Sequence, residues 1–293
     1  MTIFNLGSIN LDHFYEVPHL PAPGETLLAT AHHTGLGGKG ANQSVAAALA
    51  GAPVVHIGAV GPEGAWAVKR LQAFNVNVDS IIEVEAPTAH AIINVDPHGE
   101  NAIVVFPGAN MKQSLTRLEA ALSVAQSGDV LLLQNETNLA YEAASLARSK
   151  GVTVAYSAAP FNADATEKLL PLTDVLILNR VELEQLTEAT GRTENALGPA
   201  TTVITEGAKG GRAITASGEQ RYPAFPVQAV DTTGAGDTHA GYLAAALHEG
   251  QSLTDALRFA SAASALQVTK KGTAEAIPSR AEVDAFLKNQ PAT

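Results

Sequence analysis

Residues 231–238, with the sequence DTTGAGDT, join the extended segment Val227–Val230 to an alanine- and leucine-rich segment, Ala235–Glu249. The composition of this second segment predicts a helix that begins at the junction. Small residues at the start of a helix leave several backbone N–H groups directed at one spot, with the positive end of the helix dipole behind them. The stretch therefore predicts an anion-binding site between a strand and a helix.

Asp237 lies inside this predicted anion site, where its negative charge opposes phosphate binding. The carboxylate makes chemical sense if it accepts a proton from an attacking hydroxyl while the backbone N–H groups stabilise a transferring phosphoryl group. From the residues alone, the alternative is that Asp237 is an N-cap that contributes about 1 kcal/mol to the helix.

Outward from this stretch, short apolar runs alternate with longer segments of helical period. This alternation predicts βαβ units and a largely parallel sheet that is covered on both faces. Buried strands are expected at Ile3–Leu6, Val54–Val60, Val130–Gln134, Val152–Tyr156, Val175–Asn179 and Thr202–Thr205. Helices are expected at about Ala41–Ala50, Ala65–Phe74, Ser114–Ala125, Leu139–Ser149, Arg180–Thr190, Ala235–Glu249, Leu253–Val268 and Arg280–Lys288.

Two stretches interrupt the alternation and predict a small accessory sheet. The first, at about 13–35, contains several prolines and then an extended segment, Thr26–Thr34. The second, at about 88–106, contains two apolar runs joined by Asp96–Gly99, which indicates a hairpin. We expect both to form a lid inserted into one domain that spans residues 1–293.

A glycine-rich segment, GLGGKG at residues 35–40, precedes the helix that is expected to start near Ala41. It matches the dinucleotide-binding spacing only formally, because no acidic residue ends a second strand about 20 residues further on. It is not a P-loop either, since Gly40 rather than Ser or Thr follows Lys39. Its four glycines allow the backbone to approach a ligand closely. The alternative is a tight turn with a solvated Lys39.

The composition excludes several classes of protein. The chain of 293 residues has no cysteine, which excludes thiolate nucleophiles, zinc–thiolate sites and iron–sulfur clusters. Its 18 Lys and Arg against 29 Asp and Glu give a net charge of −11, which argues against nucleic-acid binding. No secretory signal begins the sequence, and its apolar runs are too short to span a membrane, so we expect a cytoplasmic protein without membrane contact.

The order of these motifs along the chain resembles that of a known family. Residues 231–237 resemble the C-terminal motif of the ribokinase-like (PfkB) carbohydrate kinases, and Gly35–Asn42 resembles their N-terminal glycine motif. Gly7–Asp12 and Leu20–Thr26 are similar to the ribose-phosphorylating members in particular. The resemblance covers nearly the whole chain. It implies a three-layer α/β/α fold with a central, mostly parallel sheet and a small β-sheet lid.

The reaction implied by the resemblance is phosphoryl transfer from ATP to the 5-hydroxyl of D-ribose. Asp237 matches the catalytic base of the family, and Gly234, Ala235 and Gly236 match its anion hole. The residues that match the sugar contacts are Asn10, Asp12, Gly38, Lys39, Asn42 and Glu136, together with Asp237. Such a set is chemically reasonable, because a buried polyol needs paired hydrogen-bond donors and acceptors.

The resemblance also implies sites for ATP and Mg²⁺. Asn179 and Glu182 match an Asn-x-x-Glu element that positions magnesium and phosphate through water. The remaining residues that match the nucleotide site are Thr205, Gly207 and Lys209, with Gly236 of the anion hole, and Arg212 follows close after them.

A monovalent cation, expected to be K⁺, is implied beside the anion hole. Asp231 and Thr233 match its ligands on one side, and the backbone of Lys270 and Gly272 matches those on the other. Two residues depart from the family pattern. Ala276 replaces a hydroxyl residue that often contributes to the cation site, and His239 replaces an aromatic residue such as Phe.

Several alternatives stay open from the sequence. Glu136 could be a surface carboxylate, Asn179 and Glu182 a helix cap with a solvated acid, and Lys270–Lys271 a solvated pair at a helix end. The acceptor could be fructose, 2-keto-3-deoxygluconate or a nucleoside. For a nucleoside base, an aromatic shelf could come from Phe14, Tyr15 and Phe106.

Two further expectations concern assembly and catalysis. The resemblance implies a homodimer formed through the exposed face of the lid, and a lid that excludes water when it closes over the sugar. A sugar- or nucleotide-binding regulator without catalytic activity is the remaining alternative, which the retained Asp237 and Glu182 disfavour.

Overall fold

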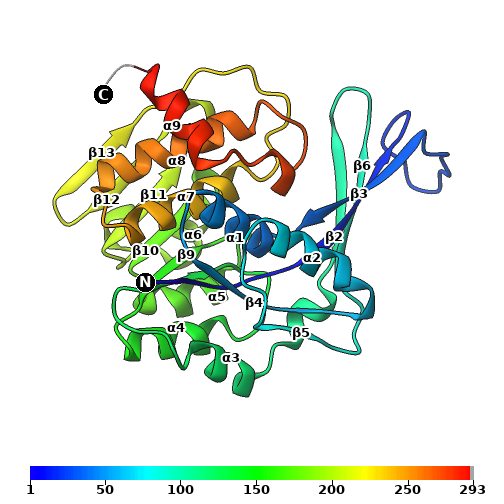
Figure 1. Ribbon diagram of the computed structural model, residues 1–293. Helices are drawn as coiled ribbons and strands as arrows, with labels where there is room; N and C mark the ends of the chain where they lie inside the picture. The colour runs from blue at the N-terminus through cyan, green and yellow to red at the C-terminus, as the bar shows by residue number, and fades with distance from the viewer. Residues whose placement is uncertain (291–293) are drawn as a thin grey trace.

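The computed structural model describes residues 1–290 and contains a large central sheet and a separate small one (Figure 1). The large sheet consists, in spatial order, of β13 (Gly218–Tyr222), β12 (Gly211–Thr215), β11 (Thr201–Thr205), β10 (Val175–Asn179), β9 (Thr153–Ser157), β8 (Val130–Leu133), β1 (Ile3–Leu6), β4 (Val54–Val60) and β5 (Ile81–Glu83). Neighbouring strands are parallel except where β12 pairs with β11 and β13. The strand order reverses between β1 and β8, and parallel sheets bind ligands beside the carboxyl ends of strands at such a point.

Helices cover both faces of this sheet, which confirms the three-layer prediction. One face carries α1 (Lys39–Leu49), α2 (Ala65–Ala73), α7 (Ala235–His248), α8 (Leu253–Gln267) and α9 (Arg280–Lys288). The other carries α3 (Leu115–Leu122), α4 (Ala140–Ser149), α5 (Ala163–Leu169) and α6 (Arg180–Thr190). Short 3₁₀ helices occupy Pro62–Gly64, Gly108–Lys112, Leu170–Leu172, Glu194–Ala196, Gly207–Lys209 and Ala274–Ala276.

The central strands are mostly apolar because each contributes to two cores, although β1 also contains the buried Asn5 and β4 the buried His56. In β8, Leu132 belongs to the core under α1 and α7, whereas Leu131 and Leu133 belong to the core under α3 and α4. Successive side chains of a strand point to opposite faces, so a strand covered on both sides has few polar positions. This is why the buried strands were recognisable as short continuous apolar runs.

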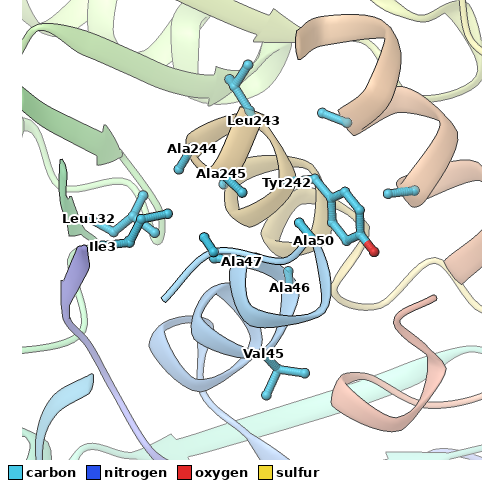
Figure 2. Packing of buried hydrophobic residues seen from close by; sticks show 14 of the residues in the cluster. Ile3, Val45, Ala46, Ala47, Ala50, Leu132, Tyr242, Leu243, Ala244 and Ala245 are labelled. Carbon is cyan, nitrogen blue, oxygen red and sulfur yellow. The ribbon is translucent and has the colours of Figure 1, made fainter. Parts of the chain in front are cut away.

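Helices α1 and α7 pack closely through small residues (Figure 2). Ala46 and Ala47 of α1 face α7, and a Cβ placed on Gly241 of α7 would lie 2.5 Å from the Cβ of Ala46. Glycine at position 241 therefore sets the close approach of the two helices. Because α1 follows the glycine-rich segment and α7 follows the DTTGAGDT stretch, this contact brings the two motifs together.

The small sheet has the order β3 (Ala31–Gly37), β2 (Asn10–Glu16), β6 (Ala89–Val95) and β7 (Asn101–Phe106). The hairpin turn at Asp96–Gly99 is confirmed, with the Gly99 N–H donating to the Asp96 carbonyl over 3.0 Å. The predicted extended segment Thr26–Thr34 is wrong in its bounds, because β3 begins only at Ala31 and continues into the glycine-rich segment. The role of this sheet as a lid, within one domain, stays a prediction.

The main elements missed by the sequence are short or polar. Strands β12 and β13 form an antiparallel hairpin at one edge of the large sheet, and α5 has only 7 residues. Edge strands need no continuous apolar run, because one side faces solvent. Along residues 1–290, no helix has the length and apolar character needed to cross a lipid bilayer.

Candidate active site

The carboxyl end of β1, the loop after β8 and the start of α1 meet at the point where the strand order reverses. Glu136, in the loop after β8, accepts hydrogen bonds from the Ser8 hydroxyl and from the Lys39 backbone N–H, the latter over 3.0 Å. The Gly40 N–H donates to the Ser8 hydroxyl oxygen over 3.1 Å. Burial raises the pKa of Glu136, and the positive charge of Lys39 partly opposes this effect. Glu136 is therefore part of a partly buried site and not a free surface carboxylate.

The glycine-rich segment is a strand end joined to a helix, and not the tight turn of the alternative. Gly35 to Gly37 belong to β3, and α1 begins at Lys39 rather than near Ala41. Gly38 between them has a φ of 93°, a conformation that favours glycine. Gly37 lies directly against Asp12, since a Cβ at position 37 would be 2.0 Å from the Asp12 carboxylate.

Two of the predicted sugar-binding residues have buried oxygen atoms without a partner. Asp12 is 7% exposed and Asn42 is 5% exposed, yet Asp12 Oδ1 and Asn42 Oδ1 have no hydrogen-bond partner among residues 1–290. Asn10 lies near them and accepts a hydrogen bond from Asn110 Nδ2 over 2.9 Å. Buried polar atoms are almost always hydrogen-bonded in proteins. A ligand with several hydroxyl groups would supply the missing donors.

The pKa of Asp12 is raised to about 7, first by burial and then by the negative charges of Glu136 and Glu275. Near neutral pH this carboxyl is therefore only partly ionised. A hydroxyl that donates to Asp12 stabilises the ionised form, so binding of such a ligand is linked to loss of a proton.

Asp237 lies in the first turn of α7 and is 8% exposed. Its Oδ1 accepts from Gln43 Nε2 over 3.0 Å, and its Oδ2 accepts from Asn42 Nδ2 over 3.3 Å. The N-cap of α7 is Gly234, in the left-handed conformation, and no side chain of the described residues caps the helix. The N-cap interpretation of Asp237 is therefore wrong. The carboxylate is held by side chains of α1 at the N-terminal end of α7, where the Ala235 N–H donates to the Thr232 carbonyl over 3.3 Å.

The charged residues of the site act on one another. The pKa of Lys39 is raised, first by the negative charge of Asp237 and then, against the effect of burial, by Glu136 and Glu182. The pKa of Glu182 is raised by burial and by Asp237, with Asn179 and Lys39 opposing. These interactions link the predicted sugar-binding, catalytic and magnesium-binding residues electrostatically, so the fold gathers them into one site.

Gln43, which the sequence analysis did not select, sets the position of Asp237. Its Oε1 accepts from Gln134 Nε2 over 2.7 Å, so its Nε2 must be the atom that donates to Asp237. Gln134 Nε2 also donates to Asn5 Oδ1 over 3.0 Å. All three amide side chains are fully buried or nearly so. In the sequence, these three residues stand out only as amide residues within otherwise apolar strands or helices.

This buried network of hydrogen bonds continues from Asn5 through Ser44 to His56, and His56 determines the direction of its hydrogen bonds. His56 Nε2 lies 3.1 Å from the Gly7 carbonyl, which can only accept, so Nε2 carries the proton. His56 Nδ1 then accepts from the Ser44 hydroxyl over 2.8 Å, and Ser44 accepts from Asn5 Nδ2. Burial lowers the pKa of His56 to about 4, which keeps the ring neutral. The chain thus presents a donor, and never an acceptor, to Asp237.

The predicted nucleotide-binding residues lie at neighbouring strand ends. Asn179 at the end of β10 is in register with Thr205 at the end of β11. Asn179 and Glu182 form a capping box, with N···O distances of 2.8 and 2.9 Å between backbone N–H groups and side-chain oxygens. Asn179 and Glu182 therefore do cap the helix, as the alternative interpretation expected. Glu182 is, however, half-buried rather than solvated. Lys209 is exposed in the 3₁₀ turn that begins at Gly207.

Arg212 does not contribute a free positive charge to this region. Its guanidinium lies 2.6 Å from Glu194, 3.2 Å from Glu219 and 3.6 Å from Glu206. Lys270 similarly pairs with Glu282 over 3.1 Å. These cations are neutralised within the protein, so the site depends on backbone N–H groups, Lys39 and the exposed Lys209 for positive potential.

The predicted cation-binding residues are close together in space. The Thr233 N–H donates to Asp231 Oδ1 over 2.9 Å, and the Gly272 N–H donates to Asp231 Oδ2 over 3.0 Å. Within residues 1–290, no group of three or more acidic or histidine side chains is arranged to hold a metal ion.

Comparison with known proteins agrees with this geometry. The family model described as pfkB family carbohydrate kinase matches residues 2–280. The chain belongs to the pfkB carbohydrate kinase family. A ribokinase of Haemophilus influenzae is 38% identical over 98% of this chain and 99% of its own length. The crystal structure of a Thermotoga maritima ribokinase, 32% identical, has a TM-score of 0.89 and covers 99% of this chain and 100% of its own.

A ligand-bound member of the pfkB family has the same fold. The structure of Arabidopsis thaliana ribokinase complexed with ribose and ATP has a TM-score of 0.85 and 30% sequence identity, and the match covers 99% of each chain. The present chain is accordingly a phosphotransferase of this family with the ribokinase fold, which confirms the predicted fold class and reaction class.

His239, where the family resemblance leads one to expect an aromatic residue such as Phe, follows Asp237 by two positions in α7. It is 4% exposed and stacks on Tyr222, with ring centroids 5.8 Å apart. Its Nε2 lies 3.4 Å from the Tyr222 hydroxyl, and its Nδ1 has no partner among the described residues. Burial lowers the pKa of His239 to about 4. The ring therefore packs as a neutral aromatic group, in the way expected of a residue such as Phe.

Replacing this histidine should make the protein less sensitive to acid. The pKa of His239 is about 4 in the folded protein, against 6.5 for an unperturbed histidine, which represents the unfolded chain. Between these two pH values the unfolded chain binds more protons than the folded protein. The free energy of unfolding therefore decreases as the pH falls through this range. From pH 7.5 to 5, His239→Phe should gain about 2 kcal/mol of unfolding free energy relative to wild type. Urea unfolding at both pH values measures this gain. Equal losses in the two proteins would contradict it.

Proposed function

We propose that this protein is an ATP-dependent ribokinase, which converts ATP and D-ribose to ADP and D-ribose 5-phosphate. The observation that carries the proposal is the placement of Asp237. Its carboxylate is oriented by Asn42 and Gln43, adjoins the uncapped N-terminus of α7, and shares Asn42 with the sugar-binding residues. The similarity to proteins named ribokinase over nearly the whole chain supports the same assignment.

In the proposed mechanism, Asp237 accepts the proton of the 5-hydroxyl as that oxygen attacks the γ-phosphorus. The new O–P bond forms while the bond to the β-phosphate oxygen breaks, and ADP leaves. The backbone N–H groups of Gly234, Ala235 and Gly236 stabilise the negative charge on the transferring group. The other proposed sugar contacts, which are Asn10, Asp12, Gly38, Lys39, Asn42 and Glu136, orient the acceptor and supply the donors and acceptors that its hydroxyls need.

The residues present fit a magnesium ion that is held mainly by the nucleotide phosphates, rather than one that is held by protein ligands. Glu182 is the acidic side chain that we propose acts on the magnesium ion, and one of its carboxylate oxygens accepts a hydrogen bond from the Asn179 N–H. Magnesium, when bound, neutralises charge on the phosphates. We propose that Glu182 and Asn179 position it through water, and that Thr205, Gly207, Lys209 and Gly236 contact the nucleotide. The cytoplasmic location stays a prediction.

The small sheet favours a sugar over a nucleoside as the acceptor. Along β2, Phe14 shares a face with Asp12, whereas Tyr15 points to the opposite face. The pairing of β2, β6 and β7 places Phe106 on the Tyr15 face as well. The three aromatic residues therefore cannot form one shelf over the acceptor, and only Phe14, stacked on His33, faces the site.

The outer strand of the small sheet has the character of a subunit interface. In β7, Ile103, Val104, Val105 and Phe106 are 50%, 70%, 54% and 44% exposed. A consecutive apolar run on an edge strand favours association with another chain. We propose that two copies form a homodimer through this sheet. No contact with nucleic acid or membrane is proposed.

An acceptor panel tests the function. kcat/KM should be measured with ATP for D-ribose, 2-deoxy-D-ribose, fructose, 2-keto-3-deoxygluconate, adenosine and cytidine. We expect ribose to exceed each of the others by at least about tenfold, which corresponds to 1.4 kcal/mol in the transition state. A preference for a nucleoside would replace the proposal with a nucleoside kinase. Binding of ribose and ATP without ADP release would indicate a regulator.

A further inference from the structure

Asp231, Thr233 and Gly272, three of the residues that the family resemblance assigns to a monovalent cation, are already bonded to one another and to Gln267. Both carboxylate oxygens of Asp231 accept backbone N–H groups, from Thr233 and Gly272. The carbonyl oxygens of Thr233 and Gly272 accept from Gln267 Nε2, over 2.7 and 3.3 Å. A cation site requires oxygen atoms that are directed at an open position. Here Gln267 Nε2 occupies the position between the Thr233 and Gly272 carbonyls, so these residues do not fit a bound K⁺.

Gln267 is well placed for this role. It is the last residue of α8 and is fully buried. One amide nitrogen carries two N–H bonds, so a single atom can satisfy both carbonyls, as a cation would. In this orientation only Oε1 lacks a partner among the described residues, whereas the opposite orientation would direct Oε1 at the two carbonyls and leave both carbonyl oxygens without a donor. The side chain therefore presents its positive end to the loop.

A second position agrees with the loss of the cation. Ala276 lies in the 3₁₀ helix Ala274–Ala276, is 1% exposed, and has no oxygen in its side chain. Ala276 therefore cannot supply the hydroxyl ligand that the family resemblance leads one to expect, and the Gln267 N–H donor occupies the carbonyls of Thr233 and Gly272.

We infer that the Gln267 amide takes the place of the monovalent cation and orders the anion-hole loop without it. The hydrogen bond to the Thr233 carbonyl holds the residue just before Gly234, whose left-handed conformation starts α7. The kinase is accordingly independent of K⁺. This inference rests on the proposed function for its activity measurement, but cation binding itself can be measured separately.

The test compares wild-type protein in KCl and in tetramethylammonium chloride at equal ionic strength. We expect kcat/KM to differ by less than about twofold and the melting temperature by less than about 1 °C, since a ligand that does not bind cannot shift either. Activation by K⁺ of more than about fivefold, or a clear rise in melting temperature with K⁺, overturns the inference.

Two variants of Gln267 make the test sharper. Gln267→Ala removes the nitrogen and opens the position, so we expect about a tenfold loss of activity in tetramethylammonium, partly restored by K⁺. Gln267→Glu directs a carboxylate at the two carbonyls, so its melting temperature should rise with K⁺ even if its activity is low. If neither variant responds to K⁺, Gln267 does not stand in for the cation.

Thr269→Val is the matched control. Thr269 follows the same helix end and donates to the Leu266 carbonyl over 2.6 Å, away from the loop. This variant should lose stability without gaining any response to K⁺. A protein that phosphorylates no acceptor in either salt would refute the proposed function, whereas the melting temperatures would still decide whether K⁺ binds.

Discussion

Asp237→Ala is expected to lower kcat for ribose phosphorylation by about 10²–10⁴-fold, because removal of a general base typically has an effect of this size. The KM for ATP should change little, since the backbone N–H groups of the anion hole remain. Steady-state ADP release measures both constants. Asp255→Ala is the matched control, because Asp255 occupies the first turn of the neighbouring helix α8 and should leave kcat unchanged. Retention of more than about a tenth of wild-type kcat would falsify the assignment of the base.

Gln43→Met separates the base from the residue that positions it. The Asp237 carboxylate would lose its 3.0 Å donor and keep only the weaker contact with Asn42. We expect kcat to fall less than in Asp237→Ala, because the base is still present but is less well oriented. In the Asp237→Ala background the same change should have no further effect on kcat. Additive losses would mean that Gln43 contributes only to stability.

The second large effect is expected at Asp12. Asp12→Ala should raise the KM for ribose by about 100-fold, since hydrogen bonds to charged groups contribute about 1.5–3 kcal/mol each. The KM for ATP should stay within about twofold of wild type, because Asp12 belongs to the small sheet rather than to the nucleotide strands. Initial rates over a grid of ribose and ATP concentrations measure both constants. An unchanged ribose KM would remove Asp12 from the sugar site.

The same carboxyl predicts how ribose binding depends on pH. The pKa of Asp12 is about 7 in the sugar-free protein, and the ionised form is the one that accepts hydroxyl donors. The KM for ribose should therefore rise as the pH falls below 7, by up to tenfold per unit. Asp12→Asn has no group to titrate and should lose this dependence. A wild-type KM that is constant from pH 8 to 6 would show that Asp12 binds sugar equally well when protonated.

Local patterns were enough to predict most of the large sheet and its helices. The strands Ile3–Leu6, Val54–Val60 and Val175–Asn179 and the helices Arg180–Thr190 and Arg280–Lys288 have the predicted bounds. A strand between two helical layers must be apolar on both faces, and a covering helix must repeat its apolar residues at helical period. Both requirements are visible within a few residues of sequence. The error at β3 has a local cause too, because glycine disfavours strands unless another group approaches closely, as Asp12 does at Gly37.

The candidate site residues could also be predicted from the sequence, through the resemblance of short motifs. Asn42 and Asp237 lie 195 positions apart in two such motifs, and the structure joins them by a hydrogen bond. Spacing alone could not show that Arg212 is neutralised by three glutamates, because those partners come from different elements.

The sequence by itself determined the fold class, the family and the type of reaction, because each depends on residues that are adjacent in the chain or recur at a regular period. Only the tertiary structure decided which atoms meet at the site. The chain of amides that orients Asp237 joins β1, α1 and the end of β8, and the amide of Gln267 reaches across to Thr233 and Gly272. Hydrogen bonds act over about 3 Å between atoms that the fold alone brings together, so no local pattern encodes them.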